Sequence, residues 1–299
     1  MILYGKKYFF MKLSRETLGW KNRGDWLDCN GRKIFVVRLG NGPIKLLCLH
    51  AFPTSSFDYS QMIPHFSSQF ELILFDFLGY GFSDKPQKYP YSLLEFADIA
   101  EFVAEYFHLK EINILAHDIG DSVALDLLTR SHVNISKLML LNGSVWSIPF
   151  TDWSMLIPQK LTLNRGIGPW LSYLRLFNKS ALKRFFDKVF YVTLAPDEID
   201  AFWSLISYND GPLNYHLLLQ YMRERWMYQD VWLNTLKSHR AKLGAVWGMS
   251  DPVATPEVLD VVTGYRPDIL STCLQNTGHY PHWERPVESA KAINSFFVD

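Results

Sequence analysis

A carboxylate occupies the position in this sequence where a catalytic nucleophile is expected. Residues 116–120 (AHDIG) follow an aliphatic run and lead into a helical pattern, with small residues two positions before and two after Asp118. Small residues at these positions let the helix pack close to the preceding strand, which pushes the central side chain into the open. The spacing therefore predicts Asp118 as a nucleophile on a strand-to-helix turn. Residues 120–124 (GDSVA) fit the same pattern with Ser122 at the centre, one turn into the helix, so Ser122 is the alternative.

Two later residues could act together with this nucleophile. Asp251 and His279 each follow a predicted late strand. The order nucleophile, acid, histidine along the chain is the order expected for an α/β architecture with the nucleophile on a strand-to-helix elbow. We therefore predict a triad of Asp118, Asp251 and His279. His282 forms an H-x-x-H pair with His279, but the sequence offers no third ligand, so we expect no metal site and no cofactor.

An oxyanion hole is predicted from backbone amides next to the nucleophile. Residues 50–53 (HAFP) follow another aliphatic run, at the end of the third predicted strand. The amide of Phe52 can converge there with the amide of Ile119 on a single oxygen. Two such donors would stabilise negative charge that develops on an oxygen during the reaction.

The elements that must hold these residues follow from hydrophobic patterning. Asn30-Gly31 lies between two short apolar runs and predicts a hairpin, because both residues accept positive φ. Ser92 with Glu95 three residues later is a capping box that opens a helix. Buried strands are predicted from aliphatic runs at residues 44–50, 71–77, 111–117, 137–142, 243–247 and 269–275. This alternation of strands and helices indicates a three-layer α/β fold with an eight-stranded, mostly parallel sheet.

The segment between the sixth and seventh strands departs from this alternation. Residues 146–234 have a mostly helical pattern and are rich in aromatic residues. We predict that they form a helical cap. The remaining residues, 1–145 and 235–299, would then form one discontinuous core domain.

Composition excludes several classes of function. Thirty basic residues balance thirty acidic residues, so the chain lacks the excess of positive charge that binds nucleic acid. No apolar run reaches the roughly 18 residues of a transmembrane segment. Three widely spaced cysteines offer no disulfide framework. We expect a cytoplasmic monomer or homodimer with no nucleic-acid partner and no transmembrane segment.

Several motifs together resemble the α/β-hydrolase fold family over essentially the whole chain. They are HAFPTSSFDY, DFLGYGFSDKP, AHDIGDSVALDLL, GMSDPV and GHYPHWERP. Aspartate at the elbow is similar to the branch that contains epoxide hydrolases and haloalkane dehalogenases. The stretch SYNDGPLNYHLLLQYMRERW, with HDIGD at the elbow, is most similar to the mesoderm-specific transcript-like hydrolases. The resemblance implies that the aspartate forms an alkyl–enzyme ester, which water activated by the histidine then hydrolyses.

The resemblance also bears on the leaving group. Haloalkane dehalogenases hold the halide with side-chain donors at the positions of Ile119 and Phe52, and neither side chain here can donate a hydrogen bond. Fluoroacetate dehalogenases have an arginine where Ile119 stands. Epoxide hydrolases instead protonate the leaving oxygen with cap tyrosines, for which Tyr221 and Tyr215 are the candidates.

The resemblance thus implies an epoxide hydrolase-like enzyme that acts on a small apolar substrate and water. A haloalkane dehalogenase or an esterase-type hydrolase is the first alternative. A binding protein that keeps this fold without turnover is the second.

Overall fold

The computed structural model describes residues 13–143 and 153–298, with the backbone only for residues 153–157. Its centre is one eight-stranded sheet in the order β1-β2-β4-β3-β5-β6-β7-β8. The strands are β1 (Gly24–Cys29), β2 (Arg32–Gly40), β3 (Ile44–Leu49), β4 (Phe70–Phe75), β5 (Ile112–His117), β6 (Ile135–Leu141), β7 (Lys242–Gly248) and β8 (Leu270–Leu274). Only the β1–β2 and β2–β4 pairs are antiparallel. The predicted mostly parallel α/β sheet is confirmed.

The hairpin between β1 and β2 forms where the sequence predicts it. Asn30 and Gly31 both have positive φ, 54° and 79°. A type I′ turn needs this backbone at both central positions, and asparagine and glycine adopt it at low cost.

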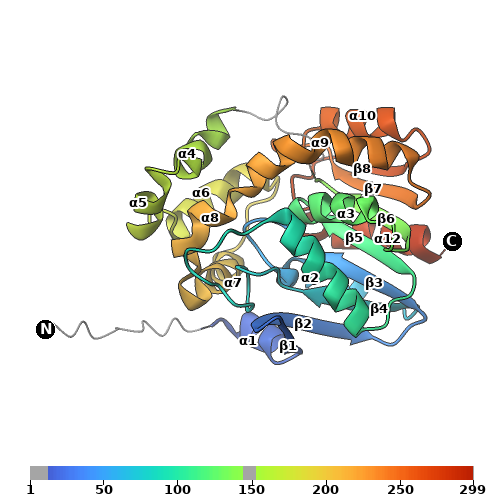
Figure 1. The fold of residues 1–299 in the computed structure, drawn as a ribbon, viewed down its shortest axis with the longest axis horizontal. Helices are drawn as coiled ribbons and strands as arrows, with labels where there is room; N and C mark the ends of the chain where they lie inside the picture. The colour runs from blue at the N-terminus through green and yellow to red at the C-terminus, as the bar shows by residue number, and fades with distance from the viewer. Residues whose placement is uncertain (1–12, 144–152, 299) are drawn as a thin grey trace, which may run out of the picture.

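Helices cover both faces of the sheet, and helices from the chain segment between β6 and β7 form a further group beside it (Figure 1). Those attached directly to the sheet are α1 (Arg15–Lys21), α2 (Leu93–Tyr106), α3 (Ile119–Thr129), α10 (Pro256–Tyr265), α11 (Pro281–Glu284) and α12 (Pro286–Val298). Between β6 and β7 lie α4 (Trp153–Leu163), α5 (Gly168–Tyr173), α6 (Lys179–Val189), α7 (Pro196–Ser207), α8 (Tyr215–Leu218) and α9 (Tyr221–Ser238). No helix among the described residues is long and apolar enough to cross a membrane.

The capping box predicted at the start of α2 is only half formed. The Ser92 side chain accepts a hydrogen bond from the Leu94 amide at 3.2 Å, as an N-cap should. Glu95 does not reach back to the N-cap, because one of its oxygens accepts from the Tyr89 hydroxyl. The other oxygen has no partner among the described residues. Tertiary packing of the loop before α2 therefore overrides the local motif.

Helix α9 joins the helices between β6 and β7 to the sheet. It leads back from that group of helices and packs against α3 (Figure 1). Trp232, Leu233 and Leu236 in its second half are buried in the core cluster that also contains residues of α3. The predicted cap boundary at residue 234 falls inside this helix. The first turns of α9 consequently lie at a fixed position relative to the turn that precedes α3.

The turn between β5 and α3 has an unusual backbone. Asp118 has φ 51° and ψ −105°, in a region that costs a non-glycine residue on the order of 1–3 kcal/mol. Two residues later, α3 comes so close to β3 that a Cβ atom on Gly120 would lie 2.5 Å from the Leu49 carbonyl oxygen. This is the strained elbow that the small residues around Asp118 predict.

Substitution of Gly120 should reveal how much the fold depends on this approach. We predict that Gly120→Ala lowers the free energy of unfolding by roughly 1–3 kcal/mol, because the added methyl group forces α3 away from β3. Urea unfolding measures the difference. Gly264→Ala in α10 is the matched control, since no atom lies within 4 Å of its added Cβ. It should be neutral or stabilising by up to about 1 kcal/mol. Equal stability of the two variants would contradict the close approach.

Candidate active site

Asp118, Asp251 and His279 lie at the edge of the sheet formed by the carboxyl ends of its parallel strands. Asp118 follows β5, Asp251 follows β7 and His279 follows β8. Carboxyl ends of parallel strands meet at one edge, which is where ligands bind in open α/β sheets. All three residues are at most 4% exposed. The loops after these strands therefore assemble a buried polar site at that edge.

His279 and Asp251 form a hydrogen-bonded pair. His279 Nδ1 lies 2.7 Å from Asp251 Oδ2. Because the carboxylate can only accept, Nδ1 carries the proton, which leaves Nε2 of the neutral ring unprotonated and able to act as a base. Nε2 has no hydrogen-bond partner in the described part of the chain.

Asn142 holds the carboxylate of this pair in place, although sequence analysis did not single it out. Its Nδ2 donates to Asp251 Oδ2 at 2.8 Å and to the Gly248 carbonyl at 3.1 Å. Its Oδ1 accepts from the Gly248 amide at 2.7 Å. The available signal was a polar residue directly after the buried strand β6, next to β7 in the sheet.

The environment raises the pKa of His279. Burial alone lowers the pKa of the imidazole, but the charge of Asp251 and its hydrogen bond outweigh that effect. Asp118 adds to the upward shift, and the Arg225 guanidinium opposes it. The pair with Asp251 therefore sets the basicity of His279.

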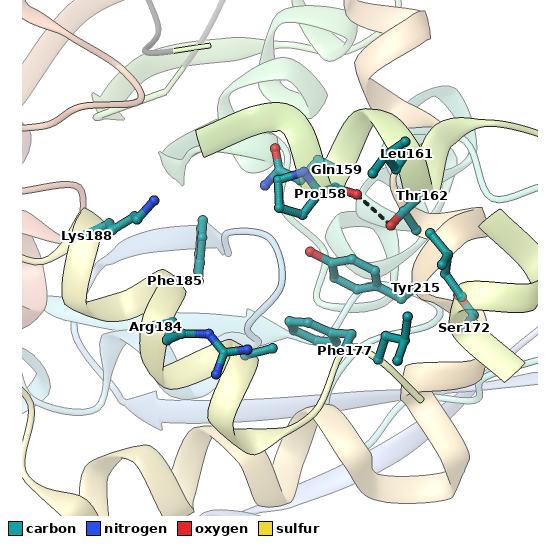
Figure 2. Close-up of a pocket in the computed structure, with 13 residues that line it drawn as sticks. Pro158, Gln159, Leu161, Thr162, Ser172, Phe177, Arg184, Phe185, Lys188 and Tyr215 are labelled. Carbon is teal, nitrogen blue, oxygen red and sulfur yellow. Dashed lines mark hydrogen bonds between the residues drawn. The ribbon is translucent and has the colours of Figure 1, made fainter. Parts of the chain in front are cut away.

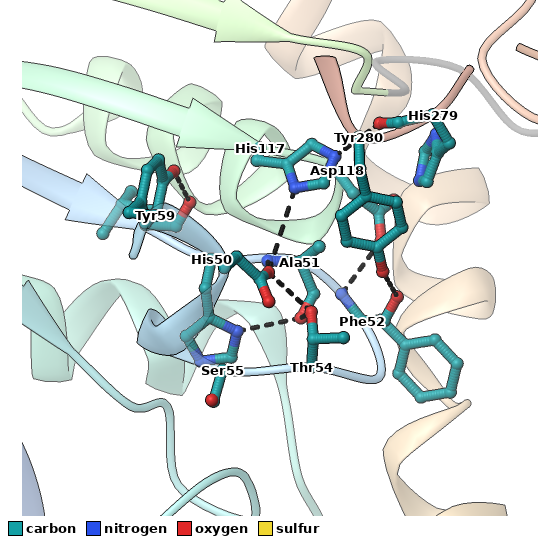
Figure 3. A network of polar contacts seen from close by, with 12 residues as sticks. His50, Ala51, Phe52, Thr54, Ser55, Tyr59, His117, Asp118, His279 and Tyr280 are labelled. Atoms are coloured by element: carbon teal, nitrogen blue, oxygen red, sulfur yellow. Dashed lines mark hydrogen bonds and ion pairs between the residues drawn. The ribbon is translucent and has the colours of Figure 1, made fainter. Parts of the chain in front are cut away.

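One oxygen of the Asp118 carboxylate binds the predicted oxyanion hole. The Phe52 amide donates to Asp118 Oδ2 at 3.0 Å (Figure 3). The loop that carries Phe52 is fixed by His50, whose Nε2 accepts from the Phe77 amide at 2.9 Å. Ile119 is the first residue of α3, where amides have no partner within the helix, and its N–H finds no acceptor among the described residues. The Ile119 amide is therefore available to a second oxyanion interaction.

Arg225 binds the other oxygen of Asp118, and sequence analysis did not identify it. Its Nη2 lies 3.1 Å from Asp118 Oδ1 and 2.9 Å from the Asp118 carbonyl oxygen. The side chains of Arg225 and Asp118 are only 8% and 6% exposed. The signal was its position on α9, four residues after Tyr221 and therefore on the same helix face. Helix α9 thus places the guanidinium cation of Arg225 beside the predicted nucleophile.

Ser122 does not have the surroundings of an activated serine. It is fully buried within α3, and its hydroxyl accepts a hydrogen bond from Arg225 Nε at 2.8 Å. This hydrogen bond makes Ser122 a support for the arginine.

Both candidate cap tyrosines pack against Phe52. The ring of Tyr221 is 5.3 Å from the ring of Phe52, and the guanidinium carbon of Arg225 lies 4.8 Å from the Tyr221 ring centre. The ring of Tyr215 is 5.4 Å from Phe52 and is stacked on Phe177 at 3.9 Å. Burial raises the pKa of both phenols, so both are protonated at neutral pH.

Tyr215 also lines a cavity of about 400 Å³ among the helices between β6 and β7 (Figure 2). Its ring lies over Phe177, and its hydroxyl points in the direction of Phe185. Most lining side chains are apolar, as in many small-molecule sites. The charged residues among them are Arg184 and Lys188, with no acidic residue.

The two histidines of the H-x-x-H pair, His279 and His282, have different polar neighbours. His282 lies with His117 and Asp58, and candidate ligand atoms of these three buried residues are within 4.8 Å of one another. The prediction concerned a third ligand for the pair of His279 and His282, whereas the structure groups His282 with two residues from distant segments and not with His279. Burial, with a smaller effect of His279, lowers the pKa of His282 to about 3. Among the described residues, Asp58, His117 and His282 are the ones that could hold a metal ion.

His117 also anchors the loop that carries His279, because its Nε2 lies 2.8 Å from the His279 carbonyl oxygen.

Comparison with known proteins assigns the chain to a family. A family model described as the alpha/beta hydrolase fold matches residues 45–286. The chain belongs to the alpha/beta hydrolase fold family.

Two relatives match this hydrolase over nearly its whole length. The putative hydrolase LipZ of Mycobacterium tuberculosis (strain H37Rv) is 37% identical over 288 residues, which are 94% of this chain and 97% of LipZ. The mesoderm-specific transcript protein of Mus musculus is 34% identical over 306 residues, covering 95% of this chain and 90% of that protein. The predicted resemblance to mesoderm-specific transcript-like hydrolases is confirmed.

Solved structures support the same fold. The epoxide hydrolase CorEH aligns with a TM-score of 0.78 at 17% identity, over 92% of this hydrolase and 98% of that chain. The haloalkane dehalogenase DatA from Agrobacterium tumefaciens C58 aligns with a TM-score of 0.80 at 15% identity, over 92% and 96%. At these identities the likeness shows the architecture alone.

Replacing Asp251 tests the electrostatics of this hydrolase site. We predict that Asp251→Asn lowers the pKa of His279, because burial then acts without the opposing carboxylate. In the wild type, NMR titration of the His279 imidazole should give a pKa above the usual value of about 6.5. In Asp251→Asn the pKa should lie below that value. Asp260→Asn, at an exposed position of α10, is the matched control and should leave the titration unchanged. An unchanged pKa in Asp251→Asn would contradict the assigned pair.

Proposed function

We propose that this chain is a hydrolase in which Asp118 attacks a carbon atom of an epoxide with an apolar body and forms an alkyl–enzyme ester. The observation that carries the proposal is the hydrogen bond from the Phe52 amide to Asp118 Oδ2. This donor supports Oδ2 as the oxygen on which negative charge develops during hydrolysis, and Oδ1 as the attacking atom. The His279–Asp251 pair supplies the base for the second step.

In the first step, Asp118 Oδ1 forms a bond to one epoxide carbon while the carbon–oxygen bond of the ring breaks. The electron pair goes to the epoxide oxygen, which takes a proton from a cap phenol. Tyr221 is supported by its contacts with Phe52 and Arg225 beside the nucleophile. Tyr215 is supported by its position on the wall of the cavity.

In the second step, His279 Nε2 takes a proton from water as the water oxygen attacks the Asp118 carboxyl carbon. The charge that develops on Oδ2 is stabilised by the Phe52 amide and the unpaired Ile119 amide. Collapse of this intermediate breaks the bond between the carboxyl carbon and Oδ1, which leaves with the alkyl group and takes up the proton held by His279 Nε2. Hydrolysis regenerates the carboxylate and releases one proton overall, which restores the phenol.

A haloalkane dehalogenase is the second candidate, and Arg225 is the observation that favours it. Expulsion of a halide needs hydrogen-bond donors but no proton. Ile119 and Phe52 supply no side-chain donor, whereas a guanidinium beside the nucleophile could solvate an anion. The choice between epoxide and halide chemistry therefore depends on whether a cap tyrosine is required.

The covalent intermediate should be trapped when the base is removed. We predict that His279→Gln incubated with styrene oxide gains the mass of one substrate molecule, because alkylation proceeds and hydrolysis does not. Intact mass spectrometry detects the adduct, and peptide mapping should assign it to Asp118.

His132→Gln is the matched control for this experiment, since His132 is an exposed histidine on the core domain. It should turn over styrene oxide without accumulating an adduct. An adduct on Ser122 would instead support an esterase-type enzyme. Normal turnover by His279→Gln would exclude the proposed role of the histidine.

Removal of the tyrosine that acts as general acid should distinguish epoxide hydrolysis from dehalogenation. We predict that Tyr221→Phe lowers the turnover of styrene oxide by roughly 10²-fold, the usual scale for a positioned general acid. Tyr215→Phe is measured in parallel, and Tyr173→Phe, at an exposed position of α5, should have no effect. Wild-type protein should release little or no bromide from 1-bromobutane. Rapid bromide release, with epoxide turnover insensitive to both cap tyrosines, would favour the dehalogenase.

A further inference from the structure

Arg225 is a buried cation whose counter-ion is the predicted nucleophile. Its Nη2 binds Asp118, its Nε binds Ser122, and its guanidinium stacks on the Tyr221 ring. These contacts fix the orientation of the planar guanidinium group. Among the described residues, Nη1 has no acceptor, so its two N–H groups are free to bind something else.

For a neutral substrate this arrangement is a disadvantage. The guanidinium stabilises the charge on Asp118 Oδ1 before the reaction, and that charge is lost from Oδ1 as the new bond forms. An interaction that is stronger in the ground state than in the transition state slows the chemical step. It also leaves Arg225 as a buried charge without a partner in the ester intermediate, which is unfavourable.

No other described group replaces Asp118 as the counter-ion. Asp121 also interacts electrostatically with Arg225, but burial together with the charge of Asp118 raises the pKa of Asp121 well above the usual range, which favours its neutral form. Among the described residues, the ion pair of Arg225 is with Asp118 and not with Asp121. A counter-ion for the intermediate would have to come from the substrate.

For an anionic substrate the same arginine is an advantage. An anionic nucleophile and an anionic substrate repel each other, and a cation bound to both removes that repulsion. A carboxylate on Nη1 would keep Arg225 paired throughout the reaction. A single negative charge suits a site in which one nitrogen of the guanidinium is free. The cavity lined by Tyr215, which packs against Phe52, contains Arg184 and Lys188 but no acidic residue in its wall.

We propose that Arg225 binds a carboxylate group of the substrate through Nη1, next to the carbon that Asp118 attacks. The substrate class is therefore an apolar molecule that bears a carboxylate beside its reactive carbon, such as an epoxide of the glycidate type. This inference rests on the proposed function for its chemistry, whereas the carboxylate site can be tested without any reaction.

The first experiment compares two epoxides that differ only in charge. Trans-3-phenylglycidate has a carboxylate where trans-β-methylstyrene oxide has a methyl group. Wild-type kcat/KM should favour the glycidate by roughly tenfold or more. Arg225→Gln should lower kcat/KM for the glycidate by roughly 10- to 100-fold, the scale of a charge-assisted hydrogen bond. The preference, which is the ratio of kcat/KM for the glycidate to kcat/KM for the neutral epoxide, should therefore fall by roughly tenfold or more. Arg225→Lys, which keeps the charge, should recover part of the preference.

Arg223→Gln is the matched control, because it removes one positive charge from an exposed position of the same helix. It should leave the preference for the glycidate unchanged. An equal loss for both epoxides in Arg225→Gln would mean that Arg225 only positions Asp118. An equal gain in kcat/KM for both epoxides would mean that Arg225 only reduces the reactivity of Asp118. Either result overturns the proposal.

The second experiment measures binding alone, by calorimetry with 3-phenylpropionate and with 3-phenylpropanamide. Wild-type protein should bind the carboxylate at least tenfold more tightly than the amide, and Arg225→Gln should abolish this difference. If no epoxide reacts but this binding pattern is found, the carboxylate site stands and the epoxide chemistry fails. If wild-type protein binds the two ligands equally, the proposal is overturned whether or not epoxides react, and whether or not Arg225→Gln folds.

Discussion

The approach of α3 to β3 at Gly120 is the constraint on which the site depends. Because the helix almost touches the Leu49 carbonyl, the chain must turn sharply at Asp118, and the residue adopts a positive φ. The same approach brings the loop after β3 beside the turn, so that the Phe52 amide reaches the Asp118 carboxylate. Two neighbouring parallel strands thus supply both the predicted nucleophile and its hydrogen-bond donor.

Buried charges at this edge of the sheet occur with partners. Asp118 has Arg225, and Asp251 has His279 together with Asn142. Removing one member of such a pair leaves the other buried and uncompensated, at a typical cost of about 3–5 kcal/mol. Arg225 comes from α9, and the His279 amide donates to the carbonyl of Val189 at the end of α6. The helices between β6 and β7 therefore help to organise the site electrostatically as well as to cover it.

Neutral histidines hold the surrounding loops. Burial lowers the pKa of His50 to about 4, so its ring accepts from the Phe77 amide and donates to the Ala51 carbonyl. Burial likewise lowers the pKa of His117, which donates to the His279 carbonyl. Each ring joins two segments that are distant in the sequence. A protonated ring could not make the first of these contacts, because both of its nitrogens would be donors.

The sequence by itself determined the sheet, the elbow at Asp118 and the order in which Asp251 and His279 follow it. These features depend on local patterns: aliphatic runs, small residues beside a turn, and polar residues at strand ends. Only the tertiary structure decided that Arg225 contacts Asp118, that Asn142 holds Asp251, and that His282 lies with His117 and Asp58. These pairs are separated by up to 224 positions, as for Asp58 and His282. No local period specifies such contacts, because they depend on how whole helices and strands dock against each other.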